Sequence, residues 1–230
     1  MSKKVLVTGS NRGLGLEFTR QWLGRGAEVF AACRHPEEAG ALNQLAAANP
    51  DRLTVIPLDV IDAAQVAAMA ERFGIGELQV LINNAGTLAS GERMGQLDPE
   101  VMEGAFRTNV IGPVLVTQAL AGALAAGGGW TINISSELGS ISQRSGFFTP
   151  SYCATKAALN MWTRMLNFAL APQGAHCVAV HPGWVQTDMG GQDAPLDAAT
   201  SVASMITLIE NLGPDHAGGF FDHHGQRLPW

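Results

Sequence analysis

The chain has 230 residues, 47% of them apolar, and a formal net charge of −6. This length and apolar content suffice to bury the core of one domain, and no repeat or linker divides the sequence, so we expect a single domain over residues 1–230. The negative charge and the lack of a basic block argue against a nucleic-acid-binding surface.

Membrane and metal-site signals are also weak. The first apolar run is too short for a signal peptide or a spanning helix, and charge, glycine or proline interrupts the later ones. The cysteines Cys33, Cys153 and Cys177 have neither paired nor metal-ligand spacing, which is typical of reduced thiols. His223 and His224 follow the predicted strand 218–222, and adjacent residues of an extended chain point to opposite sides, so we expect no metal site there. The sequence therefore predicts a cytoplasmic protein without a metal.

Short runs rich in β-branched residues alternate with longer segments of helical period, which is typical of a parallel sheet with helices on both faces. The predicted strands are 3–8, 27–33, 53–58, 78–84, 129–135, 176–181 and 218–222. The predicted helices are 13–25, 36–48, 62–73, 98–126 (with a break near Asn109), 151–171 and 197–212, and Asp62, Asp98 and Asp197 are their candidate N-caps. We expect an α/β, Rossmann-type, doubly wound parallel sheet of about seven strands that binds ligands at the carboxyl ends of its strands.

Three glycines, Gly9, Gly13 and Gly15, connect the first strand to the first helix in VLVTGSNRGLGLEF. A strand that enters a helix through small residues lets backbone N–H groups approach a pyrophosphate at the positive end of the helix. The same glycines also fit an ordinary tight turn. LINNAG (81–86) ends the fourth strand with residues that can support the glycine turn and pass close to a ribose or adenine, or can simply form a turn.

The end of the second strand bears on the choice of nicotinamide cofactor. An acidic residue there would bind the ribose 2′-OH and repel a 2′-phosphate, but this chain has Cys33 followed by Arg34. Arg12, in the glycine turn, can converge on the same pocket, and two guanidiniums favour a phosphate. Either arginine by itself is an ordinary surface charge. Together they predict NADP(H) over NAD(H).

Tyr152 is the only tyrosine in the chain, and Lys156 follows at i+4, on the same face of a predicted helix. A free phenol has a pKa of about 10, which a nearby cation lowers by favouring the phenolate. We therefore expect Tyr152 to act as general acid in carbonyl reduction, with Lys156 adjusting its pKa. Ser136, at the end of the fifth strand, is the candidate to orient the carbonyl, with Ser135 and Ser140 as alternatives.

The motifs occur in a fixed order: TGSNRGLG at 8–15, NNAG at 83–86, Asn109, the Ser135–Ser136 pair, Y-x-x-x-K at 152–156 and HPGWVQTDM at 181–189. Over essentially its whole length the chain resembles the short-chain dehydrogenase/reductase family. NISSELGSI, PGWVQTDMGGQDAPLDAATS and GGFFDHHGQRLPW are similar to its Sniffer-like and C-factor-like branch, which is associated with carbonyl reduction and, in some members, with signalling. The spacing from Ser136 to Tyr152 is longer than usual in the family, which indicates an insertion within ELGSISQRSGFFTP.

The resemblance implies an NADP(H)-dependent reductase of a small carbonyl substrate, with Asn109, Ser136, Tyr152 and Lys156 as catalytic residues. The resemblance also implies that Lys156 hydrogen-bonds the nicotinamide ribose and that Asn109 holds a water of a proton relay. Asn109 also fits an N-cap where a helix restarts. Residues 1–90 would mainly bind the dinucleotide and 91–230 would carry catalysis and substrate. The implied cofactor-binding residues are Gly9, Asn11, Arg12, Gly13, Leu14, Gly15, Arg34, Asp59, Val60, Asn83, Asn84, Ala85, Gly86, Tyr152, Lys156, Pro182, Gly183, Val185 and Thr187.

Several expectations concern substrate, partners and role. The loops 87–97, 137–150 and 188–197 would shape the substrate pocket, with Met94, Phe147, Phe148 and Trp184 as an apolar wall. DMGGQDAP fits either a mobile lid or an ordinary loop. Asp59 fits either an adenine contact or the cap of a turn.

The family resemblance favours a homodimer or homotetramer, and Met161, Trp162 and Met165 would pack in the core or at a subunit contact. The alternative function is that of an NAD(P)-binding signalling protein with incidental turnover.

Overall fold

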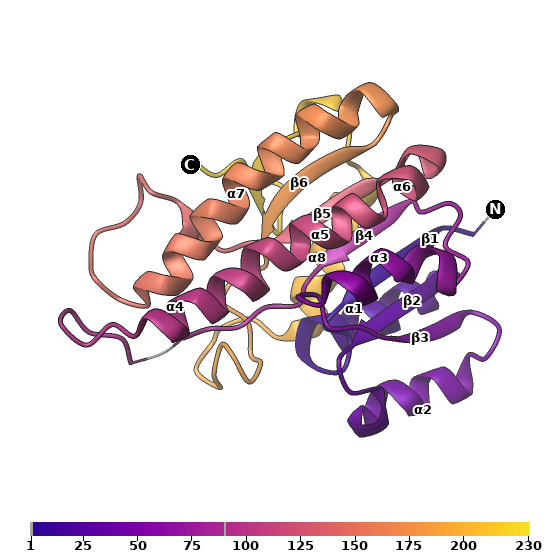
Figure 1. Cartoon of the computed structure of the whole chain (residues 1–230), viewed down its shortest axis with the longest axis horizontal. Coiled ribbons are helices and arrows are strands. Elements are labelled where there is room, and N and C mark those ends of the chain that lie inside the picture. Colours follow the sequence, from indigo (N-terminus) through magenta and orange to yellow (C-terminus); the bar gives the residue numbers. More distant parts are fainter. Residues whose placement is uncertain (1, 90) are drawn as a thin grey trace.

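The computed structural model describes residues 2–89 and 91–230, which form a parallel sheet in the strand order β3-β2-β1-β4-β5-β6-β7 (Figure 1). The strands are β1 (Lys4–Thr8), β2 (Glu28–Cys33), β3 (Leu53–Pro57), β4 (Val80–Asn83), β5 (Trp130–Ile134), β6 (His176–His181) and β7 (Phe220–Asp222). From β1 the chain builds outward to β3, crosses back, and builds outward again from β4 to β7. The predicted doubly wound sheet is confirmed, and the direction reverses between β1 and β4, where such sheets form a ligand crevice.

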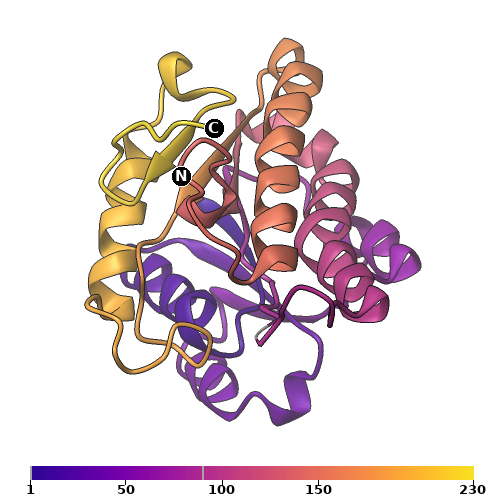
Figure 2. The same cartoon turned by 90° about the vertical axis from the view of Figure 1, so that its left-hand side faces the viewer.

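Helices cover both faces of the sheet. One face carries α1 (Gly13–Gly24), α2 (Gly40–Ala48) and α8 (Ala198–Glu210). The other carries α3 (Ala63–Arg72), α5 (Gly112–Ala119), α6 (Ala121–Gly127) and α7 (Pro150–Leu170). Figure 2 shows α8 and α7 on opposite sides of the strands. Shorter elements are α4 (Pro99–Phe106), the π turn η2 (Arg107–Ile111) and the 3-10 turns η1 (Pro36–Glu38), η3 (Glu137–Gly139), η4 (Ala171–Gln173) and η5 (Pro214–His216).

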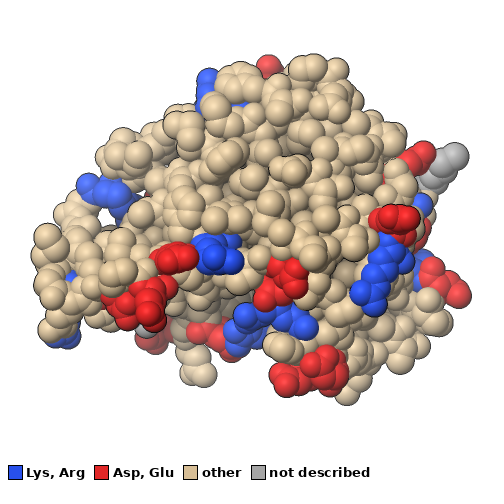
Figure 3. Space-filling view, in the orientation of Figure 1, with Lys and Arg blue, Asp and Glu red and all other residues tan. Residues whose placement is uncertain are grey.

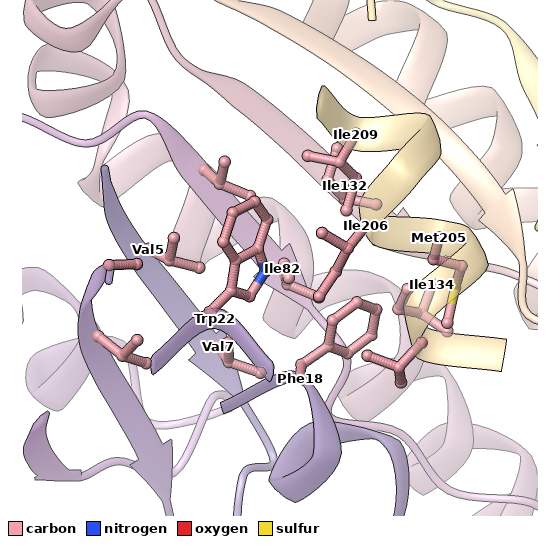
Figure 4. Close-up of a cluster of buried hydrophobic side chains, with 14 of the residues drawn as sticks. Val5, Val7, Phe18, Trp22, Ile82, Ile132, Ile134, Met205, Ile206 and Ile209 are labelled. Carbon is pink, nitrogen blue, oxygen red and sulfur yellow. The ribbon is translucent and has the colours of Figure 1, made fainter. Parts of the chain in front are cut away.

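The core is divided by the sheet, because successive strand residues face opposite sides. Val5 and Val7 of β1 lie in the cluster under α1 and α8, whereas Leu6 lies in the cluster under α3, α5 and α6. Figure 4 shows Phe18 and Trp22 of α1 packed among side chains of β1 and α8. Burying each large apolar side chain of this kind stabilises the fold by about 1.5–3 kcal/mol. This packing fixes where α1, and with it the glycine turn, meets the sheet.

Three aspartates cap helices as predicted. Asp62, Asp98 and Asp197 accept backbone N–H bonds from the first turns of α3, α4 and α8. Such bonds satisfy donors that a helix start would otherwise leave unpaired. The helix predicted over 36–48 is divided into η1 and α2 at Ala39.

The segment 98–126 differs from its prediction. The helix does not stop near Asn109; it widens there into the π turn η2 and continues as α5. Pro113 explains this, because it has no N–H to donate to the carbonyl of Asn109, four residues earlier. The change of direction comes later, between Pro99–Ala119 and Ala121–Gly127, which meet at 60°.

No single helix in the described part of the chain is long and apolar enough to cross a membrane, and only this bent pair reaches that length and composition when taken together. Its apolar side chains Val116, Leu120 and Leu124 are fully buried against the sheet.

Candidate active site

The glycine turn brings the chain so close to itself that side chains do not fit. A Cβ on Gly15 would lie 2.1 Å from the carbonyl oxygen of Gly9, and one on Gly9 would lie 2.9 Å from Cα of Ala85. Gly9 and Gly13 also have left-handed φ angles of 67° and 54°, which favour glycine. The turn ends at the start of α1, where no side chain caps the helix, so its first N–H groups are available to an anion. The turn therefore fits the close approach of a pyrophosphate.

Asn84 fastens the glycine turn to the end of β4. Its Nδ2 donates to the carbonyl oxygens of Thr8 (2.9 Å) and Gly9 (3.2 Å). The Thr8 hydroxyl oxygen in turn accepts the backbone N–H groups of Asn84 and Ala85, each at 3.0 Å. NNAG thus supports the glycine turn across the crevice. Of the other predicted residues here, Asn11 is exposed and Leu14 packs half-buried against the core.

Asn83, by contrast, is turned into the protein. Its Nδ2 donates to Asn133 Oδ1 (2.9 Å) and Thr117 Oγ1 (3.1 Å), and Asn133 continues the chain of bonds to Thr163 (2.9 Å). Adjacent residues at a strand end face opposite ways, so Asn84 reaches the crevice and Asn83 does not. The Asn83 side chain thus ties β4 and β5 to α5 and α7, which leaves the backbone of Asn83 for the expected contact with cofactor.

The structure does not bring the two candidate phosphate-binding arginines together. Arg12 forms an ion pair with Asp188, with 2.8 Å between Nη1 and Oδ2, and both side chains are exposed. Arg34 lines a cavity of about 300 Å³ with Pro57 and the outer face of α3, and Arg12 is not part of that lining. Convergence on one phosphate therefore requires Arg12 to leave Asp188.

The pair Asp59–Val60 follows β3. One carboxylate oxygen of Asp59 accepts the N–H of Ile61 at 3.2 Å, so this side chain caps its own turn, while Asp62 caps α3. Val60 is buried, and a Cβ on Gly112 would lie 2.8 Å from its Cγ2. Both side chains have contacts that shape the turn after β3.

Tyr152 and Lys156 lie one turn apart at the start of α7, as their spacing predicts. Nζ of Lys156 is 5.4 Å from the centre of the Tyr152 ring and donates to the carbonyl oxygen of Ile134 at 2.7 Å. Lys156 is only 5% exposed. The ammonium is therefore held between the end of β5 and the phenol.

Three serines were candidates to orient a carbonyl, and the structure separates them. The Ser136 hydroxyl lies next to the Tyr152 phenol, whose pKa it lowers, and it accepts the N–H of Leu138 at 3.1 Å. Ser135 donates to Oδ1 of Asn160 at 2.7 Å, and Ser140 donates to the carbonyl oxygen of Trp230 at 3.2 Å. Of the three, Ser136 is the one that acts on the pKa of the phenol.

The pKa values depart from the sequence-based expectation. Burial raises the pKa of Tyr152 to about 12, and the neighbouring Ser136 hydroxyl only partly offsets this. Burial also lowers the pKa of Lys156 to about 8. The expected lowering of the phenol pKa by Lys156 is wrong for this structure, because removing the phenolate from water outweighs the effect of the neighbouring charge. Tyr152 is consequently a protonated donor at neutral pH.

Asn109 is fully buried in η2 and uses both ends of its amide. Its Oδ1 accepts the N–H of Thr87 and its Nδ2 donates to the carbonyl of Thr87, each at 2.8 Å, and Nδ2 also donates to Thr155 Oγ1 at 3.1 Å. A Cβ on Gly86 would lie 3.2 Å from Asn109 Oδ1 and 3.9 Å from Lys156 Nζ. The N-cap alternative is therefore wrong, and Gly86 keeps open the space between Asn109 and Lys156.

The segment after β6 is fastened at its base. Val185 pairs with Leu196, and Gln186 donates its backbone N–H to the carbonyl of Leu196 at 2.8 Å. Gly183 has a φ of 85°, and the hydroxyl of Ser201 donates to the carbonyl of Pro182 at 2.6 Å. The closed base separates a turn at 187–194 from the sheet.

Thr187 lies where this segment meets the glycine turn. Its Cγ2 is 3.5 Å from the position a Cβ would take on Gly13, and its hydroxyl oxygen accepts the N–H of Gly190 at 3.1 Å. Trp184 is exposed and donates its indole N–H to the carbonyl of Gly190 at 2.7 Å.

Sequence reasoning missed the residues that hold these groups in place. Thr8 and Thr155 carry bonds that join segments 76 and 46 residues apart. A threonine gives no sign in the sequence of a partner at such a distance. Only the position of Thr8 at the end of β1, directly before Gly9, could have suggested its role.

Comparisons with known proteins agree with this geometry. The model of the short-chain dehydrogenase family matches residues 3–196. The C-signal protein of Myxococcus xanthus is 40% identical over 164 residues, which is 71% of this chain and 99% of that protein.

Two solved structures overlay nearly the whole chain. The carbonyl reductase Sniffer of D. melanogaster has a TM-score of 0.94 at 32% identity, with both chains covered completely. The NADPH-bound carbonyl reductase from chicken fatty liver has a TM-score of 0.93 at 36% identity and covers 100% of this chain and 99% of its own. The predicted resemblance to the Sniffer-like and C-factor-like branch is confirmed.

Proposed function

The chain belongs to the short-chain dehydrogenase family of oxidoreductases, and we propose that it is an NADPH-dependent carbonyl reductase that converts a ketone, aldehyde or quinone to the alcohol. The observation that carries this proposal is the Ser136–Tyr152–Lys156 arrangement: two neighbouring hydroxyls beside a buried ammonium, at the carboxyl end of β5. In this division of labour residues 1–90 mainly bind the dinucleotide, and 91–230 carry catalysis and substrate.

The roles follow from the chemistry of the groups. Bound NADPH supplies the hydride. The carbonyl oxygen accepts hydrogen bonds from Ser136 and Tyr152, and the phenol gives its proton to the alkoxide that forms. An alkoxide is a stronger base than phenolate, so the transfer is favourable even with a phenol pKa of about 12. Lys156 then stabilises the phenolate by its charge.

Asn109 and Lys156 border the space that Gly86 leaves open, which is where we place the proton relay that restores the phenol. Lys156 also bonds the nicotinamide ribose in this proposal, and Pro182, Gly183, Val185 and Thr187 line the nicotinamide side.

The glycine turn fits the cofactor, because a Cβ at Gly9 or Gly15 would occupy the space that the backbone needs. Arg34, and Arg12 once freed from Asp188, would recognise the 2′-phosphate. The similar carbonyl reductase from chicken fatty liver binds NADPH, which supports this choice of cofactor.

The substrate side is apolar. Met94, Phe147, Phe148 and Trp184 are 80%, 54%, 47% and 55% exposed, although they are large hydrophobic side chains. Their loops follow β4, β5 and β6, whose carboxyl ends border the crevice. We propose that they contact the apolar part of the carbonyl substrate, which favours quinones and aromatic ketones over sugars.

The test is loss of the reduced-nicotinamide absorbance with quinones, aldehydes and α-dicarbonyls, measured for the native enzyme and for Tyr152→Phe. We expect turnover with NADPH and a loss on the order of 10² to 10⁴-fold in the variant, whose fold and NADPH affinity stay unchanged. If the variant reduces the same substrates at the native rate, the proposed mechanism is wrong.

The likeness to C-signal favours a second candidate, a signalling protein that binds NADP(H) and turns over only incidentally. Tight NADPH binding without turnover of any carbonyl would support it. The presence of Ser136, Tyr152 and Lys156 side by side favours the reductase.

We also propose a homodimer formed through α7. Met161, Trp162, Met165 and Phe168 are 60%, 42%, 43% and 59% exposed, so they do not lie in the core, which was one of the two expectations for the first three. They recur at helical spacing, and charged side chains are sparse over the α7 side of the molecule in Figure 3. Light scattering should give twice the chain mass, and Phe168→Glu should halve it.

A further inference from the structure

The helix that carries Tyr152 begins in an unusual way. Thr149, directly before α7, has a φ of 40° and a ψ of 50°, which is the left-handed region, and it is the one non-glycine residue with positive φ in the described chain. Its side chain makes no capping hydrogen bond to the helix. A side chain that leaves the first N–H groups unpaired in a strained backbone cannot by itself hold a helix start in place.

A distant carboxylate supplies the missing cap. Glu92, 59 residues earlier, accepts the backbone N–H of Ser151 with Oε2 at 3.2 Å and the hydroxyl of Ser151 with Oε1. Ser151 is 4% exposed and Glu92 is half-buried. A negative charge at a helix N-terminus is favourable as well. Both oxygens of Glu92 are therefore bonded to the residue directly before Tyr152.

In the described part of the loop between β4 and α4, Glu92 makes one of two side-chain hydrogen-bonded attachments to α7. The other runs from Thr87 through Asn109 to Thr155, with bonds of 2.8, 2.8 and 3.1 Å. Ser151 and Thr155 are one turn apart on α7, and each directly precedes one of the two proposed catalytic residues, Tyr152 and Lys156. The helix turn that carries the phenol and the ammonium is thus held at both ends by the segment that follows the NNAG motif.

We propose that Glu92 is a positioning residue for the carbonyl reduction: by bonding Ser151 it fixes the first turn of α7 and with it the phenol of Tyr152 against Ser136. This inference rests on the proposed function. The effect is geometric, since the causes that set the pKa of Tyr152 are burial, Ser136 and Cys153, without a contribution from Glu92. A displacement of about 1 Å in a reacting group costs on the order of 10²-fold in rate.

The test compares Glu92→Ala with Glu92→Gln. Alanine removes both bonds, so we expect kcat to fall on the order of 10- to 100-fold while KM and Kd for NADPH change less than about twofold. Glutamine can accept from the N–H of Ser151 with its carbonyl and donate to the Ser151 hydroxyl with its NH₂ group, so it should recover most of kcat. Glu103→Ala on α4, where Glu103 is exposed and pairs only with Arg107, is the matched control and should retain native kcat.

A double-mutant cycle with Ser151→Ala isolates the contact. Ser151→Ala keeps the backbone N–H bond, so its loss of kcat should be smaller than that of Glu92→Ala, and the losses should not add in the double variant. This variant and Glu92→Gln also keep the inference testable if Glu92→Ala fails to fold.

Two results would overturn the positioning role: native kcat in Glu92→Ala, or equal losses in the alanine and glutamine variants, which would indicate charge rather than geometry. Failure of the proposed function is separate, because it would show as an absence of carbonyl reduction, or an intact Tyr152→Phe, in chains that retain Glu92.

Discussion

The two sides of the crevice are built in different ways. On the cofactor side, the glycine turn is set by backbone contacts so close that Gly9 and Gly15 have no room for a Cβ. On the catalytic side, the start of α7 is held by side chains from far along the sequence, such as Asn109 and Glu92. The cofactor side depends on the absence of a Cβ from its glycines, and the catalytic side depends on hydrogen bonds made by side chains from distant segments. The cofactor side should therefore be broken by added atoms, and the catalytic side by removed ones.

Gly15→Ala should have the largest effect. The new Cβ would lie 2.1 Å from the carbonyl oxygen of Gly9, a backbone atom that cannot move without opening the turn. We expect a loss of about 3 kcal/mol in the free energy of unfolding, and a loss on the order of 10²-fold in NADPH affinity. Denaturant unfolding and NADPH fluorescence titration measure the two.

Gly24→Ala is the control, because Gly24 lies on the same helix α1 but a Cβ added there would meet no neighbouring atom within 4 Å. It should be neutral or slightly stabilising, since alanine is the better helix former. If Gly15→Ala and Gly24→Ala had the same free energy of unfolding and the same NADPH affinity, the glycine turn would not depend on its lack of side chains.

The same difference explains how much the sequence could predict. The positions of the strands and helices and the glycine turn follow from the hydrophobic pattern and from glycine spacing, which are local features of the sequence. Tyr152 and Lys156 are also readable, because i and i+4 share a helix face. The inward turn of Asn83, the pairing of Arg12 with Asp188 and the cap from Glu92 are not, since each depends on a partner 34 or more residues away. The pKa of Tyr152 was mispredicted because burial, which opposes Lys156, is a property of the fold.

Lys156→Met tests the cost of the buried charge on the catalytic side. The pKa of Lys156 falls from 10.5 to about 8 on folding, so between these values the unfolded chain binds more protons than the folded one. The free energy of unfolding of the native protein therefore gains a contribution as pH rises through this window, and loses it as pH falls back through the same window. The methionine variant lacks this dependence.

We expect the stability of Lys156→Met relative to the native protein to be greater at pH 7 than at pH 10 by about 2–3 kcal/mol, while its reductase activity is lost. Urea unfolding at the two pH values gives this difference, and all other titrating groups cancel in it. Lys3→Met, at an exposed lysine, should show none. A difference that does not change with pH would mean that Lys156 keeps its ordinary pKa in the fold.

Arg34→Ala should have a smaller effect, confined to one cofactor. Arg34 is exposed and lines the cavity beside α3, where a guanidinium can meet a 2′-phosphate without breaking another contact. We expect kcat/KM with NADPH to fall about 10-fold, which is about 1.4 kcal/mol, and kcat/KM with NADH to stay unchanged because NADH has no 2′-phosphate. Arg107→Ala, at an exposed arginine of η2 that pairs with Glu103, is the matched control.

Arg12→Ala should lower kcat/KM with NADPH less than Arg34→Ala does, because Arg12 must first break its ion pair with Asp188 before it can bind the 2′-phosphate. An exposed ion pair of this kind is worth at most about 1 kcal/mol. Removing Asp188 instead should free Arg12, so Asp188→Ala should raise kcat/KM with NADPH and leave that with NADH unchanged. Equal losses with both cofactors in Arg34→Ala would show that the arginine supports the fold of the β2 end, and that the selection of NADPH lies elsewhere in the crevice.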